Sequence, residues 1–240
     1  MAKRKIGYFF YNTFLALVGL VLLPVVILRI LTGSLAWTSF KKNNPLSEKP
    51  ALWIHAATEG QLAFLAGILP TLTSLFTGYQ GVLTYTGKNT VNAGKSLSQD
   101  LLFIVLPFSI EFSAQKIISQ IKPRLLLMIE DPFYPNLVRH CKAAGVKVAL
   151  IGGRVNRRLS LVYRLAPKFL KSVFQGTDLL MMNSVTEANR IGKMGAVLAT
   201  ILVSKAVGNP GDGWEGAAEP DDDSIKEAVG AIGILLGRSF

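Results

Sequence analysis

Short runs rich in Val, Ile and Leu alternate with longer amphipathic stretches through most of the chain after residue 50. Near-continuous apolar strands that alternate with helices are typical of a parallel sheet with helices on both faces. The sequence therefore predicts an α/β fold. The expected strands cover residues 51–55, 81–86, 101–106, 124–129, 146–151, 178–182 and 196–203. The expected helices cover residues 61–75, 89–97, 111–121, 135–144, 161–174 and 185–194.

An uncharged, mostly apolar segment covers residues 6–28 and follows a basic start at Lys3, Arg4 and Lys5. It is long enough to cross a hydrocarbon core of ~30 Å at ~1.5 Å per residue, and too long for a typical cleaved signal peptide. We therefore expect residues 1–40 to form a membrane anchor. Pro24 interrupts the run and basic residues flank both of its ends, so a membrane-crossing helix and a monotopic helix on one leaflet both fit.

The charge is distributed unevenly along the chain. Residues 1–50 carry seven Lys and Arg against one acid, residues 51–205 carry seventeen against seven, and residues 206–240 carry two against seven. A basic body favours an anionic partner such as a membrane surface or a phosphorylated lipid. Nucleic acid is not an expected partner, because zinc-finger spacings, RNP motifs and basic helices with interleaved aromatics are missing. We expect an α/β domain over 41–205 and an acidic Gly- and Pro-containing tail over 206–240, with a short helix near 225–236.

Four strand–helix junctions carry most of the polar residues, and parallel sheets bind ligands outside the carboxyl ends of their strands. The first junction runs from His55 through Gly60 to Gln61. Backbone N–H groups at this helix start could hold an anion, and His55 and Glu59 could act as acid or base. The alternative is a solvated Glu59 and a hydrogen-bonded His55 at the end of a strand.

The second and third junctions are shorter. Thr86 and Gly87 resemble part of a phosphate loop, but the Walker spacing is missing, so we expect at most a ligand-contacting turn. In the third junction, Glu130 and Asp131 follow a buried strand and precede Pro132. Two adjacent carboxylates at such a place are candidates for catalysis or ligand orientation. The alternative is that they cap the following helix.

The fourth junction is strongly basic. Arg154, Arg157 and Arg158 come directly after an expected strand, and six cations lie within residues 154–171. Guanidinium groups bind phosphate in a bidentate manner where the geometry allows it. In a membrane-attached protein this pattern indicates a site for phosphorylated lipid headgroups. The alternative is a solvated basic helix face that rests on anionic lipid.

Five segments in this order resemble motifs of the Kdo transferases, which move 3-deoxy-D-manno-octulosonic acid from CMP-Kdo onto a lipid A precursor. Residues 55–61 are similar to the family's His-Ser-x-Ser-x-Gly-Glu, and residues 84–87 to a shortened Thr-x-Thr-x-Thr-Gly. Residues 122–137 are similar to its Pro-to-Glu-Thr-Glu-x-Trp-Pro-Asn-Leu segment. Residues 154–158 are similar to Asn-Ala-Arg-x-Ser-x-Arg, and residues 183–196 to Gln-Ser-x-x-Asp-Ala-x-Arg-x-x-x-Leu-Gly-Ala. The resemblance covers roughly residues 8–205.

The resemblance implies a Rossmann-like, doubly wound parallel sheet that forms the acceptor-binding half of a GT-B glycosyltransferase. It also implies a metal-independent enzyme without a cofactor, a CMP-Kdo donor substrate, and a place on the cytoplasmic face of the inner membrane. The acceptor-binding residues that it implies are His55, Gly60, Thr86, Arg154, Arg157 and Arg158.

Two departures from the family pattern affect the expected activity. Gln61 occupies the position of the family's catalytic Glu, and an amide cannot take a proton from the attacking hydroxyl, which leaves Glu59 and Glu130 as candidate carboxylates. Only 35 residues follow the resemblance, so we expect the donor-binding domain to be on another chain or lost from this gene product, and this chain to be inactive alone. The alternative is a non-catalytic membrane protein that binds lipid A-like or other anionic lipids.

Overall fold

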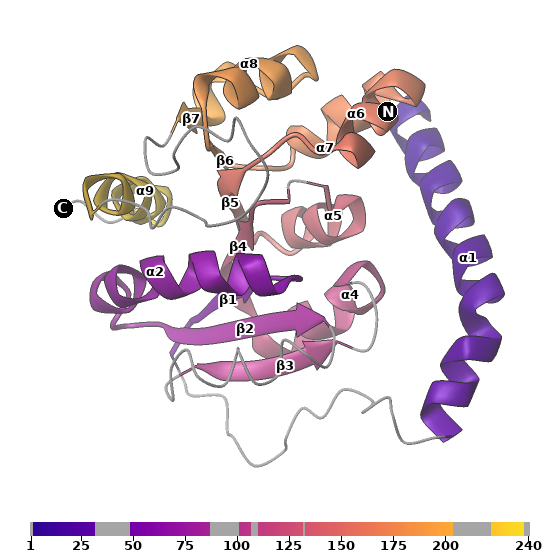
Figure 1. The fold of residues 1–240 in the computed structure, drawn as a ribbon, viewed down its shortest axis with the longest axis horizontal. Helices are drawn as coiled ribbons and strands as arrows, with labels where there is room; N and C mark the ends of the chain where they lie inside the picture. Colours follow the sequence, from indigo (N-terminus) through magenta and orange to yellow (C-terminus); the bar gives the residue numbers. More distant parts are fainter. Residues whose placement is uncertain are drawn as a thin grey trace.

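A computed structural model of the chain describes residues 2–31, 49–86, 101–106, 110–131, 133–203 and 222–237. It contains a parallel sheet with the strand order β3-β2-β1-β4-β5-β6-β7 (Figure 1). This order is that of a doubly wound Rossmann-like sheet, so the predicted fold class is confirmed. The strands are β1 (Ala51–His55), β2 (Gln80–Thr86), β3 (Leu102–Leu106), β4 (Pro123–Ile129), β5 (Lys147–Gly153), β6 (Leu179–Met182) and β7 (Ile201–Val203).

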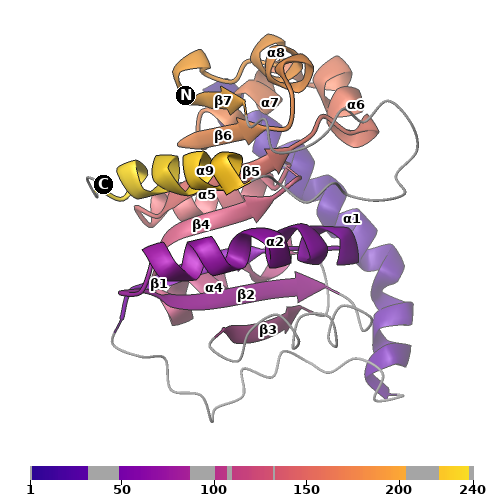
Figure 2. The same ribbon diagram turned by 60° about the vertical axis from the view of Figure 1, so that its left-hand side comes forward.

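Helices cover both faces of the sheet (Figure 2). They are α1 (Ala2–Leu31), α2 (Glu59–Leu75), α4 (Ile110–Ile121), α5 (Pro135–Ala143), α6 (Arg157–Leu165), α7 (Pro167–Phe174), α8 (Val185–Lys193) and α9 (Asp222–Leu235). Strand side chains alternate between the two faces, and both faces are apolar. In β1, for example, Trp53 packs in the core with α4, α5 and α7, whereas Leu52 and Ile54 pack in the core with α2 and α9. This double burial explains the continuous apolar runs.

The predicted helix over 161–174 is two helices, which corrects the expectation. Apolar periodicity predicts one continuous helix, because the apolar pattern continues through Ala166 and Pro167. Proline has no N–H group for a helix interior and disfavours helical geometry in the residue before it. Ala166 accordingly leaves the helical region, with φ −145° and ψ 59°, so α6 ends at Leu165 and α7 begins at Pro167.

Other differences from the expected elements are small. The strand expected over 196–203 is a 3-10 turn, Leu198–Thr200, followed by the shorter β7. The helix α6 begins four residues earlier than expected because the Asn156 side chain accepts a hydrogen bond from Leu159 N and caps it. The helix expected over 89–97, residues 32–40 of the expected anchor, residues 41–48 of the expected domain and the Gly-containing start of the tail lie outside the described residues.

The N-terminal helix α1 lies at one side of the sheet domain and continues through Pro24 (Figure 1). It packs on α7 and α5 through aromatic residues. The Tyr8 ring stands edge-on to Phe169 at 5.1 Å, and Tyr11 contacts Phe133 and Phe169 at 6.0 and 5.6 Å between ring centroids. Asn136 Nδ2 also donates a hydrogen bond to Asn12 Oδ1 at 2.7 Å. Among the residues described, no helix combines the length and the apolar character needed to cross a membrane.

Candidate functional site

The carboxyl ends of the strands place three of the four predicted junctions side by side. The strand order reverses between β1 and β4, because β2 and β3 extend to one side of β1 and β5 to β7 extend to the other side of β4. A sheet of this kind binds ligands at such a reversal point. His55 ends β1, Glu130 follows β4, and Arg154 follows the neighbouring strand β5. Thr86 ends β2 at the same edge, next to β1, where its side chain is not described.

His55 is buried, with 2% of its surface exposed, and lies inside a hydrogen-bond group rather than on the surface. Its Nδ1 is 3.0 Å from Thr84 Oγ1, which also accepts a hydrogen bond from Trp53 Nε1 at 2.9 Å. Thr84 donates its hydroxyl proton to Ile54 O, so we assign the proton on the His55 ring to Nδ1. Burial lowers the pKa of His55 to about 4, partly offset by a hydrogen bond to the backbone of Thr84. His55 is therefore neutral near pH 7, and its edge-on contact with Tyr134 at 5.0 Å shapes the site.

Gln61 forms hydrogen bonds that stabilise the start of α2. Thr58 is the N-cap, and its side chain accepts a hydrogen bond from Gln61 N at 3.2 Å. In return, Gln61 Oε1 accepts a hydrogen bond from Ala57 N at 2.6 Å, so the side chain lies buried against the turn in a variant of the capping box. Glu59, in the first turn of α2, is exposed, and Gly60 is half-buried. The turn thus separates a buried amide from a solvated carboxylate two residues earlier.

Glu130 adopts a backbone conformation that is unusual for its residue type. Its φ is 61°, in the left-handed region, and hydrogen bonds from Glu130 N to Ile151 O and from Arg154 N to Glu130 O hold it there. The same geometry aims its side chain at Arg154, whose Nη2 lies 3.5 Å from Glu130 Oε1. Burial raises the pKa of the Glu130 carboxyl and the negative charge of Asp131 adds to this, while the positive charge of Arg154 lowers it.

Asp131 is the second carboxylate at this edge of the sheet. Its Oδ1 accepts a hydrogen bond from Phe133 N at 2.9 Å, which fixes the turn after β4. Burial raises the pKa of Asp131, whereas this hydrogen bond and the positive charge of Arg158 lower it. The Arg158 guanidinium also lies over the Phe133 ring at 5.0 Å. The alternative of helix capping is wrong for these acids, because the N-cap of α5 is Tyr134 and the helix has no side-chain capping hydrogen bond.

Arg157, at the start of α6, lines a cavity of about 390 Å³ together with Val155, Ser160, Leu161 and Arg164. The predicted arginine cluster therefore divides into two parts. Arg154 and Arg158 join the acids after β4, and Arg157 joins a separate hollow on the outer side of α6.

Glu187 is a residue of this edge that the sequence reasoning did not select. One of its carboxylate oxygens accepts a hydrogen bond from Val155 N and the other accepts one from Arg190 Nη1 at 2.9 Å. It therefore ties α8 to the loop that carries the arginines. The spacing of Ser184 and Glu187 is typical of a capping box at a helix start. In the structure, the Ser184 side chain caps α8 by accepting a hydrogen bond from Glu187 N. The same signal at Thr58 and Gln61 would have shown that Gln61 has a structural role.

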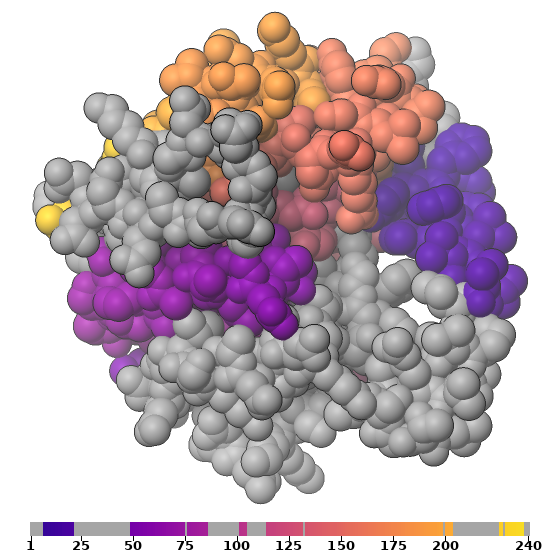
Figure 3. Space-filling model, in the orientation of Figure 1, coloured from indigo at the N-terminus to yellow at the C-terminus, as the bar shows by residue number. Residues whose placement is uncertain are grey.

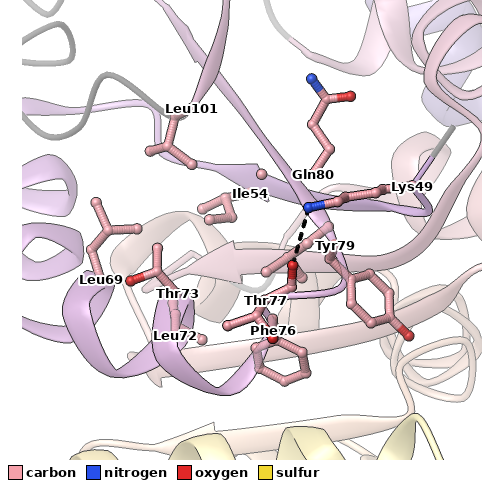
Figure 4. A pocket seen from close by; sticks show the side chains of 12 residues that line it. Lys49, Ile54, Leu69, Leu72, Thr73, Phe76, Thr77, Tyr79, Gln80 and Leu101 are labelled. Atoms are coloured by element: carbon pink, nitrogen blue, oxygen red, sulfur yellow. Dashed lines mark hydrogen bonds between the residues drawn. The ribbon is translucent and has the colours of Figure 1, made fainter. Parts of the chain in front are cut away.

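A larger cavity lies elsewhere. It has a volume of about 420 Å³ and is lined by residues at the starts of β1 and β2 and along the end of α2, including Leu72, Phe76 and Gly81 (Figure 4). At its mouth Lys49 Nζ donates a hydrogen bond to Thr77 O at 3.4 Å (Figure 4). It is at the opposite edge of the sheet from the carboxyl ends, so it does not contain the predicted site residues. Within the described ranges, no group of three or more His, Cys, Asp or Glu side chains could hold a metal ion.

Comparison with known proteins identifies a sequence family. A profile described as 3-Deoxy-D-manno-octulosonic-acid transferase (kdotransferase) matches residues 34–207. The chain is 21% identical over 194 residues to the 3-deoxy-D-manno-octulosonic acid transferase of Chlamydia pneumoniae, covering 78% of this chain and 44% of that protein. It is 23% identical over 207 residues to the enzyme of the same name from Bordetella pertussis, covering 75% of this chain and 48% of that protein.

A third relative is matched over a smaller part of its length. The bifunctional glycosyltransferase/methyltransferase of Fusobacterium nucleatum is 23% identical over 154 residues, which cover 63% of this chain and 24% of that protein. The chain thus spans less than half the length of these three relatives. Among solved structures, a putative UDP-N-acetylglucosamine 2-epimerase from Listeria monocytogenes superposes with a TM-score of 0.50 at 11% identity, over 65% of this chain and 44% of that one. This likeness concerns the fold alone.

Proposed function

The chain belongs to the 3-deoxy-D-manno-octulosonic-acid transferase (kdotransferase) family, and from this premise we propose that it is the acceptor-binding half of a glycosyltransferase in lipopolysaccharide biosynthesis. The proposed acceptor is a phosphorylated lipid A precursor. The proposed donor, CMP-Kdo, is a substrate and binds to a domain other than residues 41–205. Support for the separate donor domain comes from the matched relatives, in which more than half of the sequence lies outside the match.

The observation that carries this proposal is a cluster of arginines and carboxylates beside the strand reversal. Glu130 and Arg154 form an ion pair at the ends of the adjacent strands β4 and β5, and the Arg154 side chain is 26% exposed. Asp131 follows Glu130, and the positive charge of Arg158 on α6 lowers its pKa. Guanidinium groups held by acids at fixed positions are preorganised for phosphate, while the acids offer acceptors to sugar hydroxyls. A phosphorylated sugar presents both kinds of group, which is why this acceptor class fits the site.

The position of Gln61 argues against sugar transfer by this chain alone. The attacking hydroxyl of an acceptor has to lose its proton to a general base. The Gln61 amide cannot act as that base, and its side-chain oxygen already accepts a hydrogen bond from Ala57 N. Glu130 is the better-placed candidate, because its raised pKa brings the carboxyl nearer to the range of an effective general base. Glu59 is exposed on the outside of the turn.

We place the protein on the cytoplasmic face of the inner membrane, attached through α1. Its exposed residues include a group of large apolar side chains: Phe9, Phe10, Phe14, Leu17, Val18, Leu20 and Val21. The opposite side of α1 is occupied by contacts with α7 and α5. A helix that is fixed to its domain on one side and apolar on the other suits a monotopic position on one leaflet.

Calorimetry with the full chain in detergent tests the acceptor proposal. We expect a tetra-acylated, bis-phosphorylated lipid A precursor to bind, and R154Q/R158Q to weaken binding by about tenfold or more, since a hydrogen bond to a charged group contributes roughly 1.5–3 kcal/mol. The control K116Q/K193Q removes two exposed charges on α4 and α8 and should bind normally. Equal loss in both variants, or no binding by the wild type, would reject the proposed site.

A non-catalytic lipid-binding protein is the second candidate, and the geometry of Gln61 favours it. Transfer assays separate the two candidates. Q61E is combined with CMP-Kdo, the lipid A precursor and the carboxyl-terminal part of the Chlamydia pneumoniae transferase supplied as a separate protein. Kdo transfer that requires both this chain and the added protein supports a divided enzyme, whereas acceptor binding without transfer supports the non-catalytic alternative.

A further inference from the structure

We infer that Arg157 and Arg164 on the outer side of α6 form a second anionic site, which binds the phosphate group of a membrane phospholipid. This site is separate from the acceptor-binding arginines, and it rests on the membrane attachment proposed above. It would hold the domain against the bilayer by a headgroup contact while the acceptor occupies the strand ends.

The two sides of α6 use their arginines differently. Leu159 is fully buried, and Arg158 lies over the Phe133 ring beside the acceptor site. Arg157, Leu161 and Arg164 are spaced four and three residues apart, so they follow one another along a single side of the helix. These three residues line the cavity of about 390 Å³, which is large enough for a phosphate group with its ester oxygens.

The charges in this cavity are not neutralised by the protein. Within the described part of the chain, no carboxylate lines the cavity, and neither Arg157 nor Arg164 forms an ion pair or a hydrogen bond. The nearby acids are used elsewhere, since Glu130 pairs with Arg154 and Glu187 pairs with Arg190. Two guanidinium groups that share one hollow without a counter-charge are complementary to a phosphate.

Apolar side chains beside the arginines indicate a lipid as the source of that phosphate. Leu161 and Leu165 are 55% and 76% exposed on α6. A helix that exposes leucine and arginine side by side is suited to the interface, where aliphatic groups enter the acyl region and the cations contact headgroups.

The helix that carries the site also lies near α1. The helix α7 contacts both α1 and α6, and Figure 3 shows the indigo surface of α1 beside the orange-red surface of residues in α6 and α7. The exposed side chains of α1 include Phe9, Phe10 and Phe14. Apolar insertion by α1 and phosphate binding by α6 would act together on one leaflet.

Vesicle flotation of the full chain tests this inference. Vesicles of phosphatidylcholine alone report apolar insertion, and vesicles that also contain phosphatidylglycerol report phosphate binding by an anionic lipid. A basic side chain near an anionic surface contributes roughly a factor of five, so we expect R157Q/R164Q to lose about 20-fold in affinity for the phosphatidylglycerol vesicles at low salt. Binding to phosphatidylcholine vesicles should stay unchanged, which shows that the variant is folded.

The charge-matched variant K116Q/K193Q should lose less than threefold on the same phosphatidylglycerol vesicles. A loss equal to that of R157Q/R164Q would overturn the inference, because it would show general charge attraction instead of a site. Unchanged binding of R157Q/R164Q would also overturn it while leaving the membrane attachment standing. If the wild type binds no vesicles, the attachment itself fails. Tight calorimetric binding of inorganic phosphate that is lost in R157Q/R164Q without any change in flotation would assign the site to soluble phosphate.

Discussion

Gln61 illustrates how a residue can occupy a family's catalytic position and serve a structural purpose. Its side-chain oxygen accepts from Ala57 N, and its own N–H donates to Thr58 Oγ1, so two backbone N–H groups at the start of α2 find partners. These donors would otherwise be unpaired at a helix terminus. A glutamate side chain has the same length and can accept the same bond.

We therefore predict that Q61E unfolds with a free energy within about 0.5 kcal/mol of the wild type, while Q61A loses roughly 1 kcal/mol. The second variant leaves the Ala57 N–H without its partner. T58A should lose about 0.5–2 kcal/mol as a helix-cap deletion. Urea unfolding followed by circular dichroism measures all three, and equal stability of Q61A and the wild type would show that the cap contributes nothing.

His55 supplies a pH-dependent contribution to stability. Its pKa in the folded protein is about 4, below the usual 6.5, so the unfolded chain binds more protons between these values. The stability is present above pH 6.5 and is lost as the pH falls towards 4, by at most roughly 3 kcal/mol. Glu130 and Asp131, whose pKa values are raised, act in the opposite direction in the acidic part of this range.

We predict that H55N is less stable than the wild type at pH 7 and that the difference becomes smaller at pH 4.5. Asparagine keeps a donor near Thr84 and does not titrate in this range. Urea midpoints at the two pH values give the comparison. H140N is the control. The pKa of His140 is also lowered, but His140 is partly exposed and therefore less buried than His55. If the difference in urea midpoint between H55N and the wild type were the same at both pH values, burial would not lower the pKa of His55 as described.

At the scale of elements, α1 depends on a close approach to α7 at one glycine. A Cβ atom added at Gly7 would lie 2.8 Å from Phe169 Cδ2 and 3.1 Å from Phe169 Cβ, closer than packed carbons normally come. The Tyr8 and Tyr11 rings, one and four residues after Gly7, already contact Phe169. The absence of a side chain at position 7 therefore allows the aromatic contacts of α1 to form.

G7A should accordingly loosen α1 from the domain, and G19A is its matched control in the same helix. Nothing lies within 4 Å of a Cβ added at Gly19, and alanine favours a helix over glycine by about 0.8–1 kcal/mol. Hydrogen exchange of α1 amides in detergent is the measurement. We expect faster exchange over residues 7–12 in G7A and slower exchange around residue 19 in G19A. If G7A protects the helix as G19A does, the contact with Phe169 is not limiting.

At the scale of the whole molecule, the last described helix, α9, covers part of the sheet face on which α2 also packs. The helix α9 packs on α2, β5 and β6, and it buries Val229 and Ile232 in the same core as Leu52 and Ile54 of β1. Residues separated by more than 170 positions in the chain thus share one apolar cluster, and Figure 2 shows α9 and α2 on the same face of the sheet. Parallel strands need both faces covered, and α2 alone covers only part of this face.

We predict that I232A lowers the free energy of unfolding by about 2–4 kcal/mol and that I234A changes it by less than about 0.5 kcal/mol. Ile232 is fully buried, whereas Ile234, two positions further along the same helix, is 71% exposed. Because both changes alter helix propensity equally, their difference in urea unfolding isolates the packing of α9 on the sheet. Equal effects would mean that α9 is not docked in solution.

The sequence by itself determined the fold class and the positions of the strands. Strands that are buried on both faces of the sheet appear as continuous apolar runs, which differ from the flanking amphipathic stretches. Among the described elements, the largest error of the sequence-based prediction was the single helix over 161–174. It arose because the apolar periodicity continues across Pro167. The junctions at His55, Glu130 and Arg154 were also visible, since polar residues directly after buried strands must lie at the carboxyl edge.

Only the tertiary structure decided how those residues are used. Sequence order cannot show that Glu130 meets Arg154, because this contact depends on the adjacency of β4 and β5 and on the left-handed backbone of Glu130. It also cannot show that Arg158 lies over Phe133 while Arg157 lines a cavity with Arg164. Nor could it show that His55 is buried, since the proximity of Thr84 and Tyr134 arises from strand pairing and from the turn after β4. Local pattern fixes the elements, whereas contacts between distant segments fix the charges and the accessibility of the site.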